Sequence, residues 1–316
     1  MEKRLISILR LAIKHQASDI HLTLKGHEMI IEMRINDKMA KIKTQKGDNR
    51  LIRYLQYLAN LDVGRILVPQ TGQFEMVVDG TMLSLRFALI NNYNFSNGVL
   101  RILNSSLKIN PKRLSVYQFQ NEMLERMMRE PYGLILFSGP TGSGKTTTMY
   151  SLLNDVANSK IYTIEDPIEV YSEKYVQLQV NEAIGLDYAS GVRQILRHDP
   201  DIIMIGEIRD EKAAKMAVVA ANTGHLVLST IHSSTSASVI TRMNELGVNE
   251  QHLLEMLICS INQRMIQTKT GHKLVIYEMM DQEEIAYYHQ NRCHSASFLS
   301  IEKQLAILRK DGLIDE

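Results

Sequence analysis

The chain has 316 residues, of which 45% are hydrophobic and 22% charged, so it can fill the cores of two globular domains. Lysine and arginine together number 36 against 35 aspartates and glutamates. This balance gives no electrostatic basis for wrapping long stretches of nucleic acid, and direct nucleic-acid binding is not expected.

The composition also bears on the compartment of the protein. No run of 18 consecutive apolar residues occurs, so no bilayer-spanning segment is predicted. The two cysteines, Cys259 and Cys293, are too far apart in sequence to suggest a metal motif. We therefore expect a reduced, cytoplasmic protein, with Cys259 in the core.

Residues 1–104 are predicted to form a small α+β domain with an antiparallel sheet. Apolar residues recur at helical spacing from Leu5 to Ile13, and the stretch Ser18–Leu24 then alternates polar with apolar residues as a strand does. Further strands are expected in MIIEMRIND, GQFEMVVDG, TMLSLRFALI and GVLRIL, with an apolar helix near Leu51–Leu61.

A second domain, 114–270, is predicted after a polar, proline-containing linker at 105–113. An amphipathic helix at Tyr117–Met128 leads to the apolar run GLILFSG, a glycine-rich loop and a helical pattern. The runs IYTIED, DIIMIGE and HLVLSTIH resemble buried central strands, which favours a largely parallel sheet. Residues 271–316 are expected to be a helical tail.

The glycine-rich loop matches the phosphate-binding pattern G-x-x-x-x-G-K-[ST]. Its glycines let successive backbone N–H groups converge on phosphate oxygens, and the following helix directs its positive end to the same anion. We expect Lys145 to hold the terminal phosphates of ATP and Thr146 to offer its hydroxyl to Mg²⁺. The predicted nucleotide-binding residues are Gly139, Pro140, Thr141, Gly142, Ser143, Gly144, Lys145, Thr146 and Thr147.

Acidic residues end two of the predicted strands. Glu207 ends DIIMIGE, where a nucleotide hydrolase needs a carboxylate near the metal or the attacking water. Glu165 and Asp166 end IYTIED in the same way. A single glutamate at the end of a strand is often only exposed to solvent, with no part in a reaction. Two acidic strand ends beside a phosphate loop favour a catalytic role.

Histidines and arginines supply further candidates. His225 and His232 bracket the strand HLVLSTIH, and His232, at its expected carboxyl end, could contact the terminal phosphate; a structural histidine is the alternative. Arg86 and Arg101 lie on predicted strands of the first domain. Either could reach a nucleotide as an arginine finger.

These motifs together resemble the secretion ATPase superfamily of type II secretion, type IV pilus and competence motors. The resemblance runs from about Ala17 to Glu278 and is carried by ASDIH, VPQTG, SGPTGSGKTTTMY, TIEDPIE, LRHDPDIIMIGEIRD and TGHLVLSTIHS, in that order. It implies a RecA-like P-loop ATPase domain in the α/β class, preceded by a smaller PAS-like α+β domain.

The resemblance also implies a mechanism and partners. It implies a homo-hexameric ring, peripheral to the inner face of the cell membrane, that hydrolyses ATP with Mg²⁺ and acts on an integral-membrane platform protein and, indirectly, on pseudopilins. It assigns Lys145 and Thr146 to phosphate and Mg²⁺, Glu165 to the metal or water shell, and Glu207 to activation of water. Arg86 and Arg101 align with arginines of the family's first domain.

Departures from the family pattern bear on the choice within it. Assembly and secretion ATPases carry an extra N-terminal domain and a two-pair cysteine zinc module, but here Met1 lies close to Ala17 and Gln263–Lys273 holds no cysteine, so no zinc is expected. The AIRAGE sequence of retraction motors is also absent from the chain. The pattern resembles competence-pilus ATPases of the ComGA type, and thus a motor for DNA uptake.

Four alternatives stay open at this point. Pilus retraction and type II protein secretion use the same chemistry. A nucleic-acid-translocating ATPase would share the core but lacks support from the neutral charge. A slow nucleotide-binding scaffold is disfavoured by the intact Glu165 and Glu207.

Overall fold

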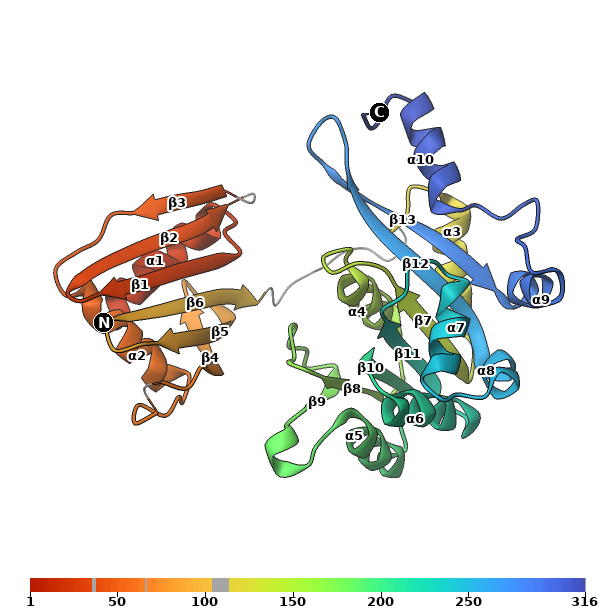
Figure 1. Cartoon of the computed structure of the whole chain (residues 1–316), viewed down its shortest axis with the longest axis horizontal. Helices are drawn as coiled ribbons and strands as arrows, with labels where there is room; N and C mark the ends of the chain where they lie inside the picture. The colour runs from red at the N-terminus through yellow and green to blue at the C-terminus, as the bar shows by residue number, and fades with distance from the viewer. Residues whose placement is uncertain (36–37, 66, 104–113, 316) are drawn as a thin grey trace. The chain divides into compact units, whose positions relative to one another are not determined.

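The computed structural model describes residues 1–35, 38–65, 67–103 and 114–315. The chain divides into two compact units, the first containing Met1–Ser106 and the second most of the remainder. Each unit is built around a sheet of its own (Figure 1). The predicted linker, 105–113, lies outside the described residues.

The first unit is an antiparallel sheet with the strand order β3-β2-β1-β6-β5-β4. Its strands are β1 (Asp19–Lys25), β2 (Glu28–Ile35), β3 (Lys38–Ile42), β4 (Gln70–Val78), β5 (Thr81–Asn91) and β6 (Phe95–Leu103). Its helices are α1 (Glu2–Lys14) and α2 (Leu51–Leu58), the latter preceded by the short 3-10 turn η1 (Asp48–Arg50).

One face of this sheet makes the core of the first unit. Alternate residues point to the same face of a strand, so Leu85 and Phe87 of β5, both fully buried, face the helices. The buried Leu9 of α1 and Leu55 of α2 pack into the same cluster. The predicted order of helix followed by antiparallel strands is confirmed.

The second unit is a seven-stranded sheet with the order β13-β12-β7-β11-β10-β8-β9. Every neighbouring pair is parallel except β12 and β13, so the predicted mostly parallel α/β sheet is confirmed. Its strands are β7 (Gly133–Ser138), β8 (Ile161–Glu165), β9 (Tyr175–Gln179), β10 (Ile202–Ile208), β11 (Leu226–Ile231), β12 (Leu257–Gln267) and β13 (Lys273–Asp281).

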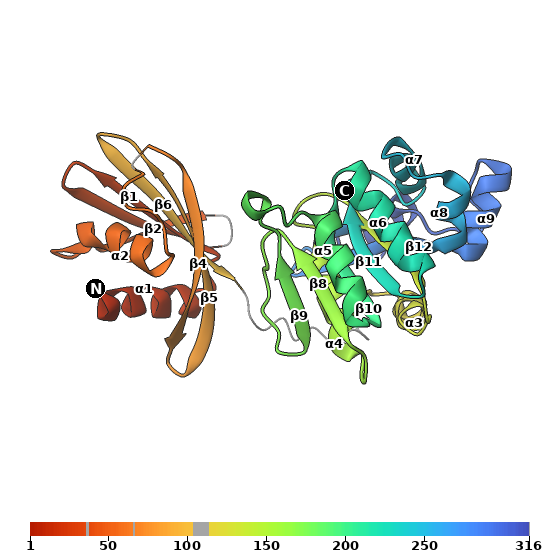
Figure 2. The same ribbon diagram turned by 90° about the horizontal axis from the view of Figure 1, so that it is seen from below.

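Helices cover both faces of this sheet, as parallel strands require. Figure 2 shows α3 and α4 on the opposite face from α6, α7 and α8. The helices are α3 (Gln118–Met127), α4 (Lys145–Asp155), α5 (Tyr188–Ile195), α6 (Glu211–Asn222), α7 (Ser238–Glu245), α8 (Glu250–Met256), α9 (Gln282–Asn291) and α10 (Ile301–Lys310), with 3-10 turns η3 (Glu182–Ile184) and η4 (Leu196–His198).

The predicted helical tail at 271–316 is wrong in its first part. Residues Lys273–Asp281 form β13, an antiparallel edge strand paired along its whole length with β12. Tyr277 and Met280 of this strand are fully buried. The run KLVIYEMMD is rich enough in apolar residues to bury both its faces, so it completes the sheet. The second unit therefore continues beyond residue 270.

Candidate functional site

The phosphate loop connects β7 to α4. Gly139, Gly142 and Gly144 all have positive φ, at 131°, 80° and 87°. A Cβ on Gly139 would lie 2.3 Å from the carbonyl oxygen of Gln263, so this position needs glycine for its space as well as for its backbone angle. Gly144 is the residue before α4, whose first backbone N–H groups are available to an anion.

The ammonium of Lys145 lies within the loop. Its Nζ donates hydrogen bonds to the carbonyl oxygens of Gly139 at 2.9 Å and Pro140 at 3.1 Å. Burial lowers the pKa of Lys145. The charge is thus held beside the loop's backbone, where a phosphate would neutralise it.

Glu165 ends β8 and is almost fully buried, at 3% exposure. One of its oxygens, Oε1, accepts hydrogen bonds from Tyr150 at 2.7 Å and Thr163 at 2.6 Å. Tyr150 lies on α4 one turn beyond Thr146, so the two side chains share a face of the helix. Glu165 therefore lies on the side of α4 that carries the Thr146 hydroxyl.

Glu207, near the end of β10, is held by two neighbours. Nε2 of His232, directly after β11, lies 3.3 Å from Oε2 of Glu207. Arg209 forms an ion pair with the other oxygen, Oε1, and its Nη1 also donates to Asp166 at 3.1 Å. The carboxylates of Glu207 and Asp166, predicted separately from two strands, are thus joined through one guanidinium.

The strand order explains why these groups meet. β7, β11, β10 and β8 are consecutive and parallel, so their carboxyl ends lie at one edge of the sheet. These ends lead, in that order, to the phosphate loop, His232, Glu207 and Glu165. Ligands of open α/β sheets bind at this edge.

The family described as Type II/IV secretion system protein matches residues 1–309. The chain belongs to this family. It is 36% identical over 272 residues to the type II secretion system protein E of Aeromonas hydrophila, covering 84% of this chain and 54% of the relative. It is 38% identical over 269 residues to the competence protein ComGA of Halalkalibacterium halodurans, covering 83% of this chain and 77% of the relative.

A solved structure supports the same membership. The crystal structure of the pilus retraction motor PilT with bound ADP superposes with a TM-score of 0.77 at 28% identity, covering 98% of this chain and 94% of PilT. The chain spans about half, 54%, of the length of the type II secretion relatives. The predicted resemblance and the predicted fold class are both confirmed.

In this member of the Type II/IV secretion system protein family, the first-unit arginines face each other. Arg86 on β5 is paired in register with Arg101 on β6. Nε of Arg101 donates to Asp19 at 2.7 Å, and the Asp19 side chain is only 8% exposed. Asp19 belongs to the ASDIH motif, so at least one role of that motif is to bind Arg101.

Three residues around the site of this family member were not predicted from the sequence: Arg209, Tyr150 and Gln263. Arg209 lies inside the motif LRHDPDIIMIGEIRD, directly after β10, and its place two residues after Glu207 was a usable signal. Tyr150, on the first helix turn after the loop motif, gave a weaker one. Gln263 of β12 gave none, because its contacts lie 120 residues away in sequence.

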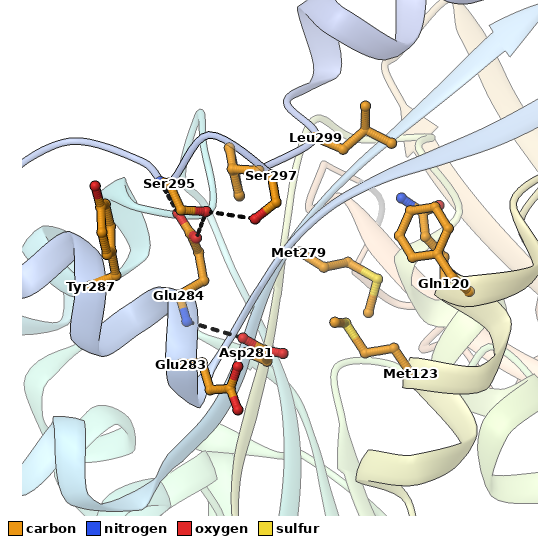
Figure 3. Close-up of a pocket in the computed structure, with 12 residues that line it drawn as sticks. Gln120, Met123, Met279, Asp281, Glu283, Glu284, Tyr287, Ser295, Ser297 and Leu299 are labelled. Atoms are coloured by element: carbon orange, nitrogen blue, oxygen red, sulfur yellow. Dashed lines mark hydrogen bonds between the residues drawn. The ribbon is translucent and has the colours of Figure 1, made fainter.

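A separate cavity lies away from the phosphate loop. It has a volume of about 340 Å³ and lies between α3, β13, α9 and the segment after α9 (Figure 3). Met123 and Met279 point into it, and Asp281, Glu283 and Glu284 line its acidic side. Among the described residues that line it, none belongs to the phosphate loop.

In the part of the chain that the structure describes, every helix is too short or too polar to cross a membrane.

Proposed function

We propose that this protein is an ATPase that works as a homo-hexameric motor in the assembly of a type IV pilus-like competence pseudopilus. The observation that carries the proposal is the arrangement at the sheet edge, where the phosphate loop, His232, Glu207 and Glu165 follow consecutive parallel strands. A phosphate site with a carboxylate positioned for water is what hydrolysis of ATP requires.

The residues divide the chemistry between them. The loop's N–H groups and Lys145 bind the phosphates, and Glu207, oriented by Arg209 and His232, accepts a proton from the attacking water. The Thr146 hydroxyl and the Glu165 carboxylate fit an oxygen-ligated Mg²⁺, since Tyr150, one turn beyond Thr146 on α4, donates a hydrogen bond to Glu165. Bound Mg²⁺ would neutralise charge on the phosphates. Arg86 and Arg101 would supply further positive charge.

The choice of a competence motor is supported by the relatives it resembles. Two relatives named competence protein ComGA are 35% and 38% identical to the chain. We propose that the motor acts at the inner face of the membrane on a platform protein and so drives pseudopilin addition during DNA uptake, without binding DNA itself. Its net charge of +1 agrees with a motor that does not itself bind DNA.

Pilus retraction is a second candidate, favoured by the likeness to the retraction motor PilT, with a TM-score of 0.77 at 28% identity. Assembly and retraction are distinguished by deleting the gene for this protein in cells that carry the pilin genes. Loss of an assembly motor leaves cells without fibres, whereas loss of a retraction motor leaves them with more or longer fibres. A deletion that removes fibres supports assembly, and one that increases them overturns it.

ATP binding and ring formation are tested on the purified full chain. Lys145→Ala is expected to lose ATP binding, because the loop then lacks the positive charge that binds the phosphates. Lys160→Ala, which changes an exposed lysine directly before β8, is expected to bind ATP normally. Light scattering with ATP and Mg²⁺ is expected to give the mass of six copies. A monomer at high protein concentration, or hydrolysis that rises on adding DNA, would contradict the proposal.

A further inference from the structure

We propose that Gln263 of β12 is a positioning residue that fixes the conformation of the phosphate loop. The inference rests on the proposed function, because it assigns this side chain to the ATP site. Gln263 is fully buried, at 0% exposure, on the strand next to β7. It lies outside every motif that identifies the phosphate site in the sequence.

Gln263 contacts the loop at three places. Its Nε2 donates a hydrogen bond to the carbonyl oxygen of Ser143 at 2.6 Å. Its own carbonyl oxygen would lie 2.3 Å from a Cβ on Gly139, and its Nε2 would lie 3.1 Å from a Cβ on Gly144. The loop is therefore packed against Gln263, and the approach of the Gln263 backbone carbonyl leaves no room for a side chain at Gly139.

The hydrogen bond to Ser143 also sets the direction of a phosphate donor. The carbonyl of Ser143 and the N–H of Gly144 belong to one planar trans peptide, in which the two bonds point in opposite directions. With the carbonyl of Ser143 held toward Gln263 of β12, the N–H of Gly144 points away from that side chain. Converging backbone N–H groups are what bind phosphate oxygens in such loops.

Gln263 is itself held on a rigid element. It is paired in register with Tyr277 of β13, whose hydroxyl lies 2.9 Å from Thr148 Oγ1 on α4. Its neighbour Asn262, also fully buried, donates to Ser138 Oγ at 2.9 Å, directly before the loop. The β12–β13 hairpin thus holds the strand before the loop, the loop and the helix after it.

The test compares Gln263→Met with Gln267→Met in the full chain. Methionine keeps the length and volume of the side chain but removes the donor to Ser143. Gln267 is a matched control, because it lies four residues along the same strand, on the same face, and is exposed. Should Gln263→Met fail to fold, Gln263→Asn keeps the amide but is too short to reach the loop.

The readout is the dissociation constant of fluorescent ADP and AMP analogues. We expect Gln263→Met to weaken ADP binding about tenfold, equivalent to about 1.4 kcal/mol, while AMP binding changes less than about twofold and Gln267→Met alters neither. A loss of affinity confined to ADP, which has the longer phosphate chain, identifies the phosphate loop as the part that Gln263 positions. Equal weakening of both nucleotides, as a general structural defect would give, overturns the inference, as does no change in either.

Hydrogen exchange separates this inference from the proposed function. Without nucleotide, peptides spanning 139–146 are expected to exchange about tenfold faster in Gln263→Met than in the parent, and at the parent's rate in Gln267→Met. If exchange is faster in Gln263→Met than in the parent, but the parent does not bind ADP, only the ATPase proposal is contradicted. A parent that binds ADP, with unchanged exchange and affinity in Gln263→Met, contradicts the role of Gln263 alone.

Discussion

Nε2 of His232 lies 3.3 Å from Oε2 of Glu207, while Arg209 contacts the other oxygen of the same carboxylate. Each oxygen of Glu207 thus has its own partner, and the two partners come from different segments at the sheet edge. Such a pair of contacts fixes the plane of the carboxylate and its direction, which a proton acceptor needs in order to meet an attacking water.

His232→Ala is expected to slow ATP hydrolysis at least about tenfold, because Glu207 loses one of its two orienting contacts. ATP affinity should stay within about twofold, since Lys145 and the loop are unchanged. Steady-state turnover and equilibrium ATP binding measure the two effects separately.

His225, at the other end of the same strand, is the matched control. Its Nδ1 lies 3.0 Å from the carbonyl oxygen of Ala220, so His225→Ala should lower the melting temperature and leave turnover of the folded protein unchanged. If His225→Ala and His232→Ala affected turnover equally, the orienting role of His232 would be wrong.

Arg209→Ala is expected to reduce turnover by about tenfold or more, because it separates Glu207 from Asp166 and leaves both carboxylates without the shared cation. ATP binding should be retained. Arg129→Ala serves as the control, since that guanidinium is 80% exposed and its partner Glu125 lies at 3.8 Å. Unchanged turnover in Arg209→Ala would show that the guanidinium has no part in positioning Glu207.

The Asp19–Arg101 pair predicts a pH dependence of stability. Burial raises the pKa of Asp19, but hydrogen bonds from Arg101 and Ser18 outweigh burial and leave this pKa below its usual value. A carboxylate with a lowered folded-state pKa stabilises the fold above its unfolded-state pKa, about 4, and loses that contribution as pH falls through the folded-state value.

Asp19→Asn is therefore expected to lower the free energy of unfolding by about 2 kcal/mol at pH 7, with the difference shrinking below about pH 4. Urea unfolding across this pH range measures it. Asp79→Asn is the control, because Asp79 and its partner Arg10 are both 58% exposed and should contribute little. A cost for Asp19→Asn that does not change with pH would contradict the ion-pair account.

Local patterns were enough to predict the phosphate loop and the strand-end acids. Lys145 and Glu207 each have a fixed place in a short motif, and each motif begins with a short apolar run typical of a buried strand. The parallel order of the strands then follows from the helices between them. Features that a contiguous stretch of sequence encodes, such as the phosphate loop and the strand-end acids, were therefore predictable.

Contacts made across the sheet were not predictable in this way. Tyr277 lies in a run that short-range periodicity does not separate from a helix, and only its pairing with β12 makes it a strand. Gln263 acts on Ser143 through a tertiary contact that no local spacing records. The ion pair of Arg209 with Glu207 lies between these cases, since the two residues are close in sequence but Arg209 follows the end of β10.

In the proposed reaction, Glu207 activates water beside a phosphate loop that binds ATP. Glu207→Gln keeps the size of the side chain and removes its ability to accept a proton, so turnover should fall at least about 100-fold while ATP stays bound as tightly as in the parent.

The most direct measurement is the fate of radiolabelled ATP bound to Glu207→Gln and to the parent in a single turnover. The account predicts ADP from the parent and intact ATP retained on Glu207→Gln, with Glu211→Gln, an exposed glutamate on α6, behaving as the parent. Equal rates of ADP formation in Glu207→Gln and the parent would contradict it.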